Sequence, residues 1–306
     1  MPEPSPPAPV VYCSDLSADR FDPADLFDVA YLLSSPAKLS LQAIVLPEGD
    51  DNARALDVLA ARIPNAPNLS VVSGAEGIAG VLRGASEPAN VVAVANVAPL
   101  AELLRSDRAL FREKVARLFL VGGHANDYAL PHTEGERLPI DPRLQERHPE
   151  RFARSGDSRQ SDAERKAFGE LLTSGEGVIW LPRDICLWRY AAPQILSDGG
   201  AVCELLLREL FFANLQTMPD RFAAGDAPVL LSALPAFLLA TQTDPLGWLR
   251  LFRTVTVRVE TDADTGTVTG LAAKHERPNA YAVVGMDGAA LGKVLTQSLR
   301  TRPLIP

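Results

Sequence analysis

An acid-rich junction between an apolar strand and an apolar helix constrains this chain more than any other stretch. Residues 10–13 (VVYC) form a β-favouring run. Apolar residues at the i, i+3, i+4, i+7 spacing of one helix face then recur at Leu26, Val29, Ala30 and Leu33. Five carboxylates lie at this junction: Asp15, Asp19, Asp22, Asp25 and Asp28. The sequence therefore predicts an acidic cluster at the carboxyl end of the first strand, the edge where open α/β sheets bind ligands.

Helix capping offers a simpler explanation for part of this cluster. Asp22 followed by Pro23 is typical of an N-cap with Pro at the first helical position, and Asp19 and Asp28 also favour such a structural role. Crowded carboxylates, however, repel one another unless a cation or protonation relieves them. Ca²⁺ and Mg²⁺ bind carboxylate oxygens, so capping and metal binding both stay open for Asp22.

Composition restricts the classes of protein to consider. The chain has 306 residues, of which 47% are hydrophobic and 22% charged, and these values are typical of a globular protein. Its formal net charge of -8 argues against nucleic acid as a partner, because phosphate contacts need clustered Lys and Arg. The sequence contains no run of roughly 18 apolar residues, so it predicts no membrane span.

The first nine residues, MPEPSPPAP, lack the cationic start and apolar core of a signal peptide. They predict a disordered Pro-rich lead-in at 1–9, followed by a single domain at 10–306. The cysteines, Cys13, Cys186 and Cys203, fit neither a disulfide framework nor a CxxC metal site, which favours a cytoplasmic location.

Apolar strands alternate with helices through the first half of the chain. Strands are expected at 39–46, 69–72, 91–94, 115–121 and 177–181, and helices at 52–62, 100–104, 163–172, 201–214 and 288–300. This alternation predicts an α/β fold with a doubly wound, mainly parallel, Rossmann-like sheet. Residues 254–260 and 267–271, joined by DADTG, predict a small β-hairpin before the C-terminal helix.

The acid-rich junction resembles the amino-terminal signature of the nucleoside hydrolases (inosine-uridine preferring N-ribohydrolases). In that family a strand ends in Asp-x-Asp-x-Gly-x-Asp-x-Asp-Asp and leads into an Ala/Leu-rich helix. The resemblance implies that Asp15 is the metal-bound carboxylate that activates water, and that Asp25 is a second metal ligand. Ala24 stands in place of an Asp that contacts ribose, and Asp22 could cover part of that loss. Cys13 stands in place of the first Asp.

The resemblance extends to later strand ends. Asp50, after Gly49, falls on the Asn of a Gly-Asn pair and is a candidate substrate contact. Val97 begins the turn that resembles the family's Thr-Gly-Pro-Leu-Thr-Asn, which implies a backbone carbonyl for the metal near Asn96 or Val97. The strand ending in Gly122-Gly123 also fits the family pattern.

The polar segment 126–161 is expected to be a functional lid or a solvated excursion. The ribose-binding Asn of the family falls on Ser158 there, with Asp157 beside it, so both are candidate substrate contacts. His124 and His132 are the available candidates for protonating a leaving base.

One departure concerns the metal and the leaving group together. Where the family has a late His-Asp-Pro, this chain has Leu234 and Pro235 within LLSALPA, so one carboxylate ligand and one His are missing. Ca²⁺ held by Asp15, Asp25, Asp22 and Val97 would bind more weakly, because affinity follows ligand charge and number.

The resemblance implies a divergent hydrolase of N-glycosidic bonds in nucleosides or related ribosyl compounds, with metal-activated water and Asp15 as the base. The alternative is a catalytically impaired relative that binds a small sugar-like ligand or serves as a structural module. A Mg²⁺ phosphatase-like enzyme built on the same acids is a weaker third hypothesis. The expected partner is thus a small nucleoside or sugar-like molecule, and the sequence leaves a homo-oligomer open.

Overall fold

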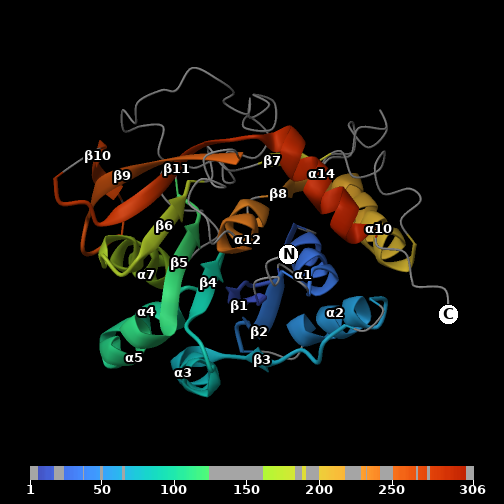
Figure 1. Ribbon diagram of the computed structural model, residues 1–306, viewed down its shortest axis with the longest axis horizontal. Helices are drawn as coiled ribbons and strands as arrows, with labels where there is room; N and C mark the ends of the chain where they lie inside the picture. Colours follow the sequence, from blue (N-terminus) through green and yellow to red (C-terminus); the bar gives the residue numbers. More distant parts are fainter. Residues whose placement is uncertain are drawn as a thin grey trace, which may run out of the picture.

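The structure is a computed structural model, and it places a central sheet between two layers of helices (Figure 1). It describes residues 6–16, 24–36, 38–48, 51–63, 66–123, 161–182, 188–190, 200–217, 229–231, 233–241, 251–266, 268–273 and 276–300. Within these residues, no helix is both long and apolar enough to cross a membrane.

The described strands form one large sheet in the order β10-β9-β11-β6-β5-β4-β1-β2-β3. Its strands are β1 (Ala8–Cys13), β2 (Leu39–Val45), β3 (Val71–Val72), β4 (Ala89–Ala93), β5 (Val115–Val121), β6 (Val178–Leu181), β9 (Phe252–Thr261), β10 (Val268–Ala273) and β11 (Ala280–Met286). Within this sheet of described strands, β9 pairs antiparallel with both of its neighbours, β10 and β11, whereas β11 pairs with β6 in parallel. The prediction of a mainly parallel α/β sheet is confirmed. A separate pair joins β7 (Trp188–Tyr190) to β8 (Val229–Leu231).

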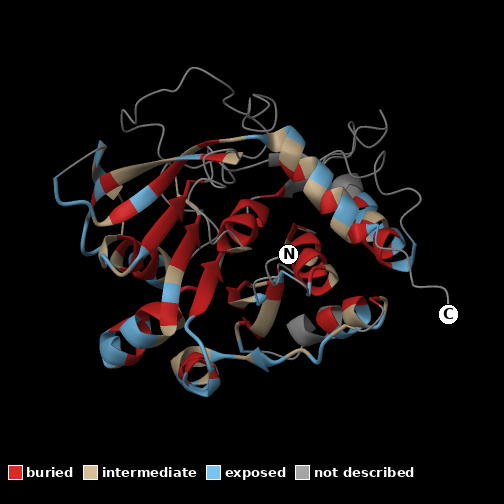
Figure 2. Ribbon diagram, in the orientation of Figure 1, coloured by how far each residue is buried: buried red, intermediate tan, exposed pale blue. Residues whose placement is uncertain are grey.

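Two sets of helices cover the two faces of the sheet (Figure 1). One set comprises α1 (Ala24–Ser34), α2 (Asp51–Ala60), α10 (Ala201–Thr217), α12 (Leu234–Thr241) and α14 (Gly288–Leu299). The other comprises α3 (Gly74–Gly84), α4 (Ala98–Ser106), α5 (Arg108–Lys114) and α7 (Asp162–Thr173). Successive strand residues face opposite sides of the sheet. Tyr12 therefore packs in the core under the first set of helices, and Cys13 packs in the core under the second set. The central strands are buried along most of their length (Figure 2).

The sheet differs from the sequence-based expectations at three places. Residues 74–84, which are not among the expected helices, form α3, and the expected hairpin gains a third strand, β11. The expected lead-in at 1–9 is too long, because β1 already begins at Ala8. Pro9 is tolerated there because it pairs only with β2, and the pairing with β4 starts at Val10.

The order of the strands creates a topological switch point beside β1. The chain passes from β1 to β2 and β3 on one side, then returns to β4, β5 and β6 on the other. The crevice outside the carboxyl ends of two such strands is where open α/β sheets bind ligands. Residues that follow β1 and β4 therefore lie where the sequence predicted the site.

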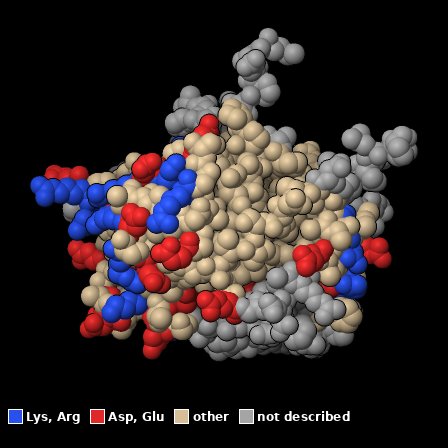
Figure 3. Space-filling view, turned by 90° about the horizontal axis from the view of Figure 1, so that it is seen from below, with Lys and Arg blue, Asp and Glu red and all other residues tan. Residues whose placement is uncertain are grey.

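Charged side chains of both signs are interspersed on the face shown in Figure 3. Ion pairs between such groups connect α4 and α5 to α7 and the residues after it. Arg105 lies 2.5 Å from Glu170, and Arg108 and Arg112 lie 2.7 and 2.9 Å from Glu176. Among the described residues on that face, acidic side chains interrupt the basic ones, so they form no unbroken basic surface of the kind that phosphate backbones require. The absence of a nucleic-acid partner stays a prediction.

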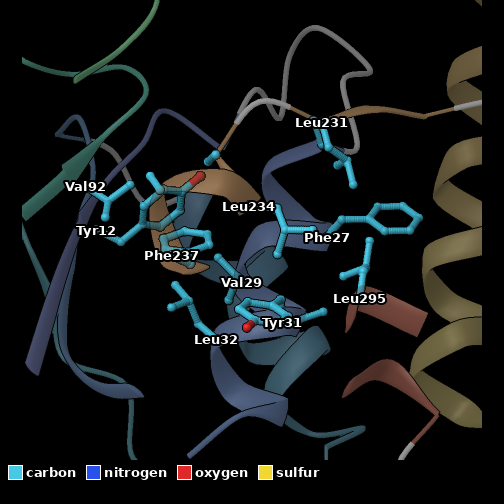
Figure 4. Close-up of a cluster of buried hydrophobic side chains, with 14 of the residues drawn as sticks. Tyr12, Phe27, Val29, Tyr31, Leu32, Val92, Leu231, Leu234, Phe237 and Leu295 are labelled. Atoms are coloured by element: carbon cyan, nitrogen blue, oxygen red, sulfur yellow. The ribbon is translucent and has the colours of Figure 1, made fainter. Parts of the chain in front are cut away.

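Aromatic packing joins α12 to β1 and α1 in the core (Figure 4). The ring of Phe237 lies 5.3 Å from the Tyr12 ring in an edge-to-face arrangement and 6.2 Å from the Tyr31 ring in a stacked one. Both geometries are favourable for aromatic pairs. Phe237 therefore fixes the position of α12 over β1.

Truncating Phe237 should destabilise the whole domain. Phe237→Ala is expected to lower the free energy of unfolding by about 3–5 kcal/mol, because it leaves a cavity between three elements. Phe212→Ala on α10 is the matched control, since the Phe212 side chain is 54% exposed and Phe237 is fully buried. Urea denaturation of both variants measures the difference, and equal losses would contradict the assignment of Phe237 to the core.

Candidate functional site

Hydrogen bonds fix the loop that leaves β1. The backbone N–H of Ser14 donates to the Val45 carbonyl (3.1 Å), which ties the loop to β2. The Ser14 hydroxyl accepts from the Leu16 N–H (2.9 Å) and donates to Oδ2 of Asp25 in the first turn of α1 (2.5 Å). Asp15 lies between the two loop residues that this bond network holds. Its half-buried carboxylate group and that of Asp25 thus belong to one short region at the strand end.

Unusual backbone angles mark the same edge of the sheet. Leu16 after β1 and Asn96 after β4 have φ values of 49° and 53°, which residues other than Gly seldom adopt. Such strain is concentrated at functional sites, so it supports a site at the switch point. Gly122 and Gly123 after β5 also have positive φ, at 146° and 68°. They pack on the rings of Phe168 and Trp180, which is a structural reason for Gly.

The first turn of α4 is closed by an acid from another helix. The Glu164 carboxylate of α7 accepts from the backbone N–H of Val97 (2.7 Å) and of Ala98 (3.0 Å). The Val97 carbonyl oxygen accepts from the N–H groups of Leu100 (3.1 Å) and Ala101 (3.0 Å). A carbonyl oxygen has two lone pairs, so both are engaged within the helix. The predicted metal contact of Val97 would compete with these bonds.

A second polar contact lies deeper between β1 and α1. The Tyr12 hydroxyl donates to Oδ2 of Asp28 at 3.2 Å, and both residues are buried. Burial first, and then the negative charges of Asp25 and Asp28, hold the pKa of Tyr12 well above its usual value. Asp28, for which the sequence favoured capping, therefore bonds to the neighbouring strand from the interior of α1.

Cys13 cannot replace the carboxylate that the family has at its position. Burial, followed by the charge of Glu164, raises the pKa of the Cys13 thiol to about 12. In the absence of a cation the thiol is therefore protonated at neutral pH. Its side chain also belongs to the core on the opposite side of the sheet from Tyr12.

The structure brings together some of the predicted residues and does not describe others. Asp15, Asp25 and Val97 lie at the carboxyl edge around the switch point. Leu234 and Pro235 are buried at the start of α12. The remaining candidates lie outside the described residues: Asp22, Asp50, His124, His132, Asp157 and Ser158. Among the residues that the structure describes, no three or more His, Cys, Asp or Glu side chains form a group able to hold a metal ion.

Sequence reasoning missed the residues that organise this edge. Tyr12 in β1 and Ser14 just after it are spaced i, i+2, and Asp25 and Asp28 share one side of α1 at i, i+3. These matching spacings were the available signal for the paired contacts. For Glu164 the only local signal was an acid in the first turn of α7, after the Ser161 N-cap.

The fold defined by this sheet and its switch point is that of the nucleoside hydrolases. No family model and no curated protein matches the sequence. Solved structures similar to the chain include an inosine-guanosine nucleoside hydrolase (TM-score 0.65, 12% identity), which covers 97% of this chain and 100% of its own. A purine-preferring ribonucleoside hydrolase from Gardnerella vaginalis has a TM-score of 0.62 at 14% identity, covering 95% and 98%. A plant nucleoside hydrolase has the same score and identity, covering 97% and 100%. At these identities the similarity establishes the fold.

Removing the Glu164 carboxylate should loosen the start of α4. Glu164→Ala is expected to lower the free energy of unfolding by about 1–2 kcal/mol, because two backbone donors lose a charged acceptor. Glu102→Ala, an exposed acid on α4 itself, is the control and should change stability little. Chemical denaturation compares the two, and a loss in the control as large as in Glu164→Ala would contradict the capping role.

Proposed function

We propose that the chain hydrolyses the N-glycosidic bond of a nucleoside or a related ribosyl compound, with Asp15 as the base. The observation that supports this most directly is the Ser14 contact, which holds Asp25 beside the loop that carries Asp15 at the switch point. The similar solved structures are named as nucleoside hydrolases, which agrees with a ribosyl ligand at this edge.

The proposed chemistry needs a proton acceptor and a negatively charged site. Hydrolysis of a glycosidic bond passes through an oxocarbenium-like transition state, in which the sugar ring becomes positively charged. The Asp15 carboxylate would take the proton of the attacking water. The neighbouring carboxylate of Asp25 would stabilise the developing positive charge, and Ser14 would hold Asp25 in place.

Calcium is the weaker part of this proposal. Ca²⁺ takes six to eight oxygen ligands, typically with several carboxylates. The described residues supply two, Asp15 and Asp25, while Leu234 and Pro235 supply none and the Val97 carbonyl is engaged in α4. These residues alone do not fit a calcium site, and Asp22 would have to contribute to one. The proton transfer to Asp15 is therefore proposed without a metal-dependent step.

A binding protein without hydrolytic activity is the second candidate. The observation that favours it is the start of α12, where residues 234–240 are all buried and apolar. This stretch aligns with the position at which the resemblance implies a His for the departing base. Without that group, the same edge would still bind a ribosyl ligand but would release its base slowly.

An activated riboside separates the two candidates. A nitrophenyl leaving group needs little protonation, whereas a purine or pyrimidine base lacks general-acid help that is typically worth about 10²- to 10⁴-fold in rate. We expect measurable hydrolysis of nitrophenyl riboside and little or none of inosine. Asp15→Ala should abolish the nitrophenyl riboside activity, and the release of nitrophenolate measures it.

Asp57→Ala, which removes an exposed carboxylate on α2, is the control and should retain the activity. No hydrolysis by the unmodified protein above the Asp15→Ala background would exclude the hydrolase proposal. Saturable ribose or nucleoside binding without turnover would then support the binding protein.

A thermal-shift titration tests calcium separately. A ligand that binds only the folded state stabilises it by about 2.7 kcal/mol at a hundredfold excess over Kd. If Asp15 and Asp25 hold Ca²⁺, either alanine substitution should remove the Ca²⁺-dependent rise in Tm, and Asp57→Ala should keep it. Identical shifts in all three variants would mean that Ca²⁺ acts on diffuse surface charge.

A further inference from the structure

The donors at the start of α4 are fully engaged inside the protein. In open α/β folds, a helix that begins at a switch point commonly binds phosphate through its first backbone N–H groups. Here the N–H groups of Val97 and Ala98 donate to the Glu164 carboxylate at 2.7 and 3.0 Å. Pro99 has no N–H, and the next two N–H groups donate to the Val97 carbonyl. The first turn thus offers no backbone donor to a ligand.

The carboxylate that accepts these hydrogen bonds at the start of α4 is part of the protein itself. It comes from Glu164 in α7, 67 residues away from Val97 in the sequence. The Glu164 N–H donates to the Ser161 side chain at 3.2 Å, which fixes the first turn of α7. The carboxylate therefore occupies the backbone donors that the start of such a helix offers to a phosphate in other open α/β folds.

We propose that Glu164 is a specificity-determining residue that excludes phosphate-bearing ligands from this edge. A phosphate carries about 1.5 to 2 negative charges at neutral pH. It would be repelled by the Glu164 carboxylate, which already accepts from the N–H groups of Val97 and Ala98. It would have to displace an internal anion whose position is already fixed by folding. This inference deepens the proposed function and rests on it for the ribosyl ligand: the site accepts nucleosides or free ribosyl compounds and rejects their 5′-phosphates.

Calorimetric titration with inorganic phosphate and with ribose 5-phosphate tests the role of Glu164. The unmodified protein should bind neither at millimolar concentration. Glu164→Ala should gain at least about tenfold in affinity for both, because two charge-assisted donors become available and one repulsive charge is lost. Glu164→Gln, which retains the side-chain size, should show a smaller gain. Glu170→Ala removes an acid from the same helix and should gain nothing.

Backbone amide chemical shifts locate the gained site. In Glu164→Ala, phosphate should shift the amide signals of Val97 and Ala98. Phosphate binding by the unmodified protein, no gain in folded Glu164→Ala and Glu164→Gln, or an equal gain in Glu170→Ala would each overturn the inference. Phosphate binding gained at these amides without any nucleoside binding would support the role of Glu164 and count against the proposed function. Nucleoside hydrolysis by the unmodified protein, without a gain of phosphate affinity in Glu164→Ala, would support the proposed function and count against the role of Glu164.

Discussion

The hydrogen bond from Ser14 to Asp25 joins the end of β1 to the first turn of α1. Ser14 is itself held to β2 through its backbone, so the bond fixes a helix relative to two parallel strands. The orientation of α1 in turn determines how Phe27, Tyr31 and the rest of its apolar side enter the core beneath α12. A single short contact thus sets both the packing of the first layer and the relative placement of the two proposed site carboxylates.

Polar groups continue below that contact into an otherwise apolar layer. Tyr12 and Asp28 repeat the strand-to-helix bond deeper in the core, at the expense of removing a carboxyl group from water. Buried polar pairs of this kind contribute little net stability compared with apolar residues of the same size. They do, however, penalise a shifted register, because sliding α1 along β1 would break both contacts together. The paired contacts therefore specify one alignment of α1 on the sheet.

The sequence predicted the parts of this fold that follow local periodicity. Continuous apolar runs predicted most parallel strands, and the acid-rich junction placed Asp15 and Asp25 near the carboxyl end of the first strand, where the structure has them. The sequence did not predict α3, because glycines at positions 74, 77 and 80 obscured the helical spacing of the buried residues Ile78 and Leu82. It also did not predict the roles of Glu164 and Ser14, whose partners lie in other elements. Such pairings depend on the packing of α7 against α4 and of α1 against β1, and local sequence patterns do not encode them.

The contacts between α7 and the strand ends also bear on how this chain can change during evolution. Gly122 and Gly123 pack on α7 through Phe168, and Glu164 attaches the same helix to α4. The two ends of the connection between β5 and α7 are therefore anchored independently of what lies between them. Since the entropy of closing a connection grows only with the logarithm of its length, these two anchors can accommodate connections of different lengths at small cost in stability. A change in the length of this connection would therefore leave the scaffold at the sheet edge in place.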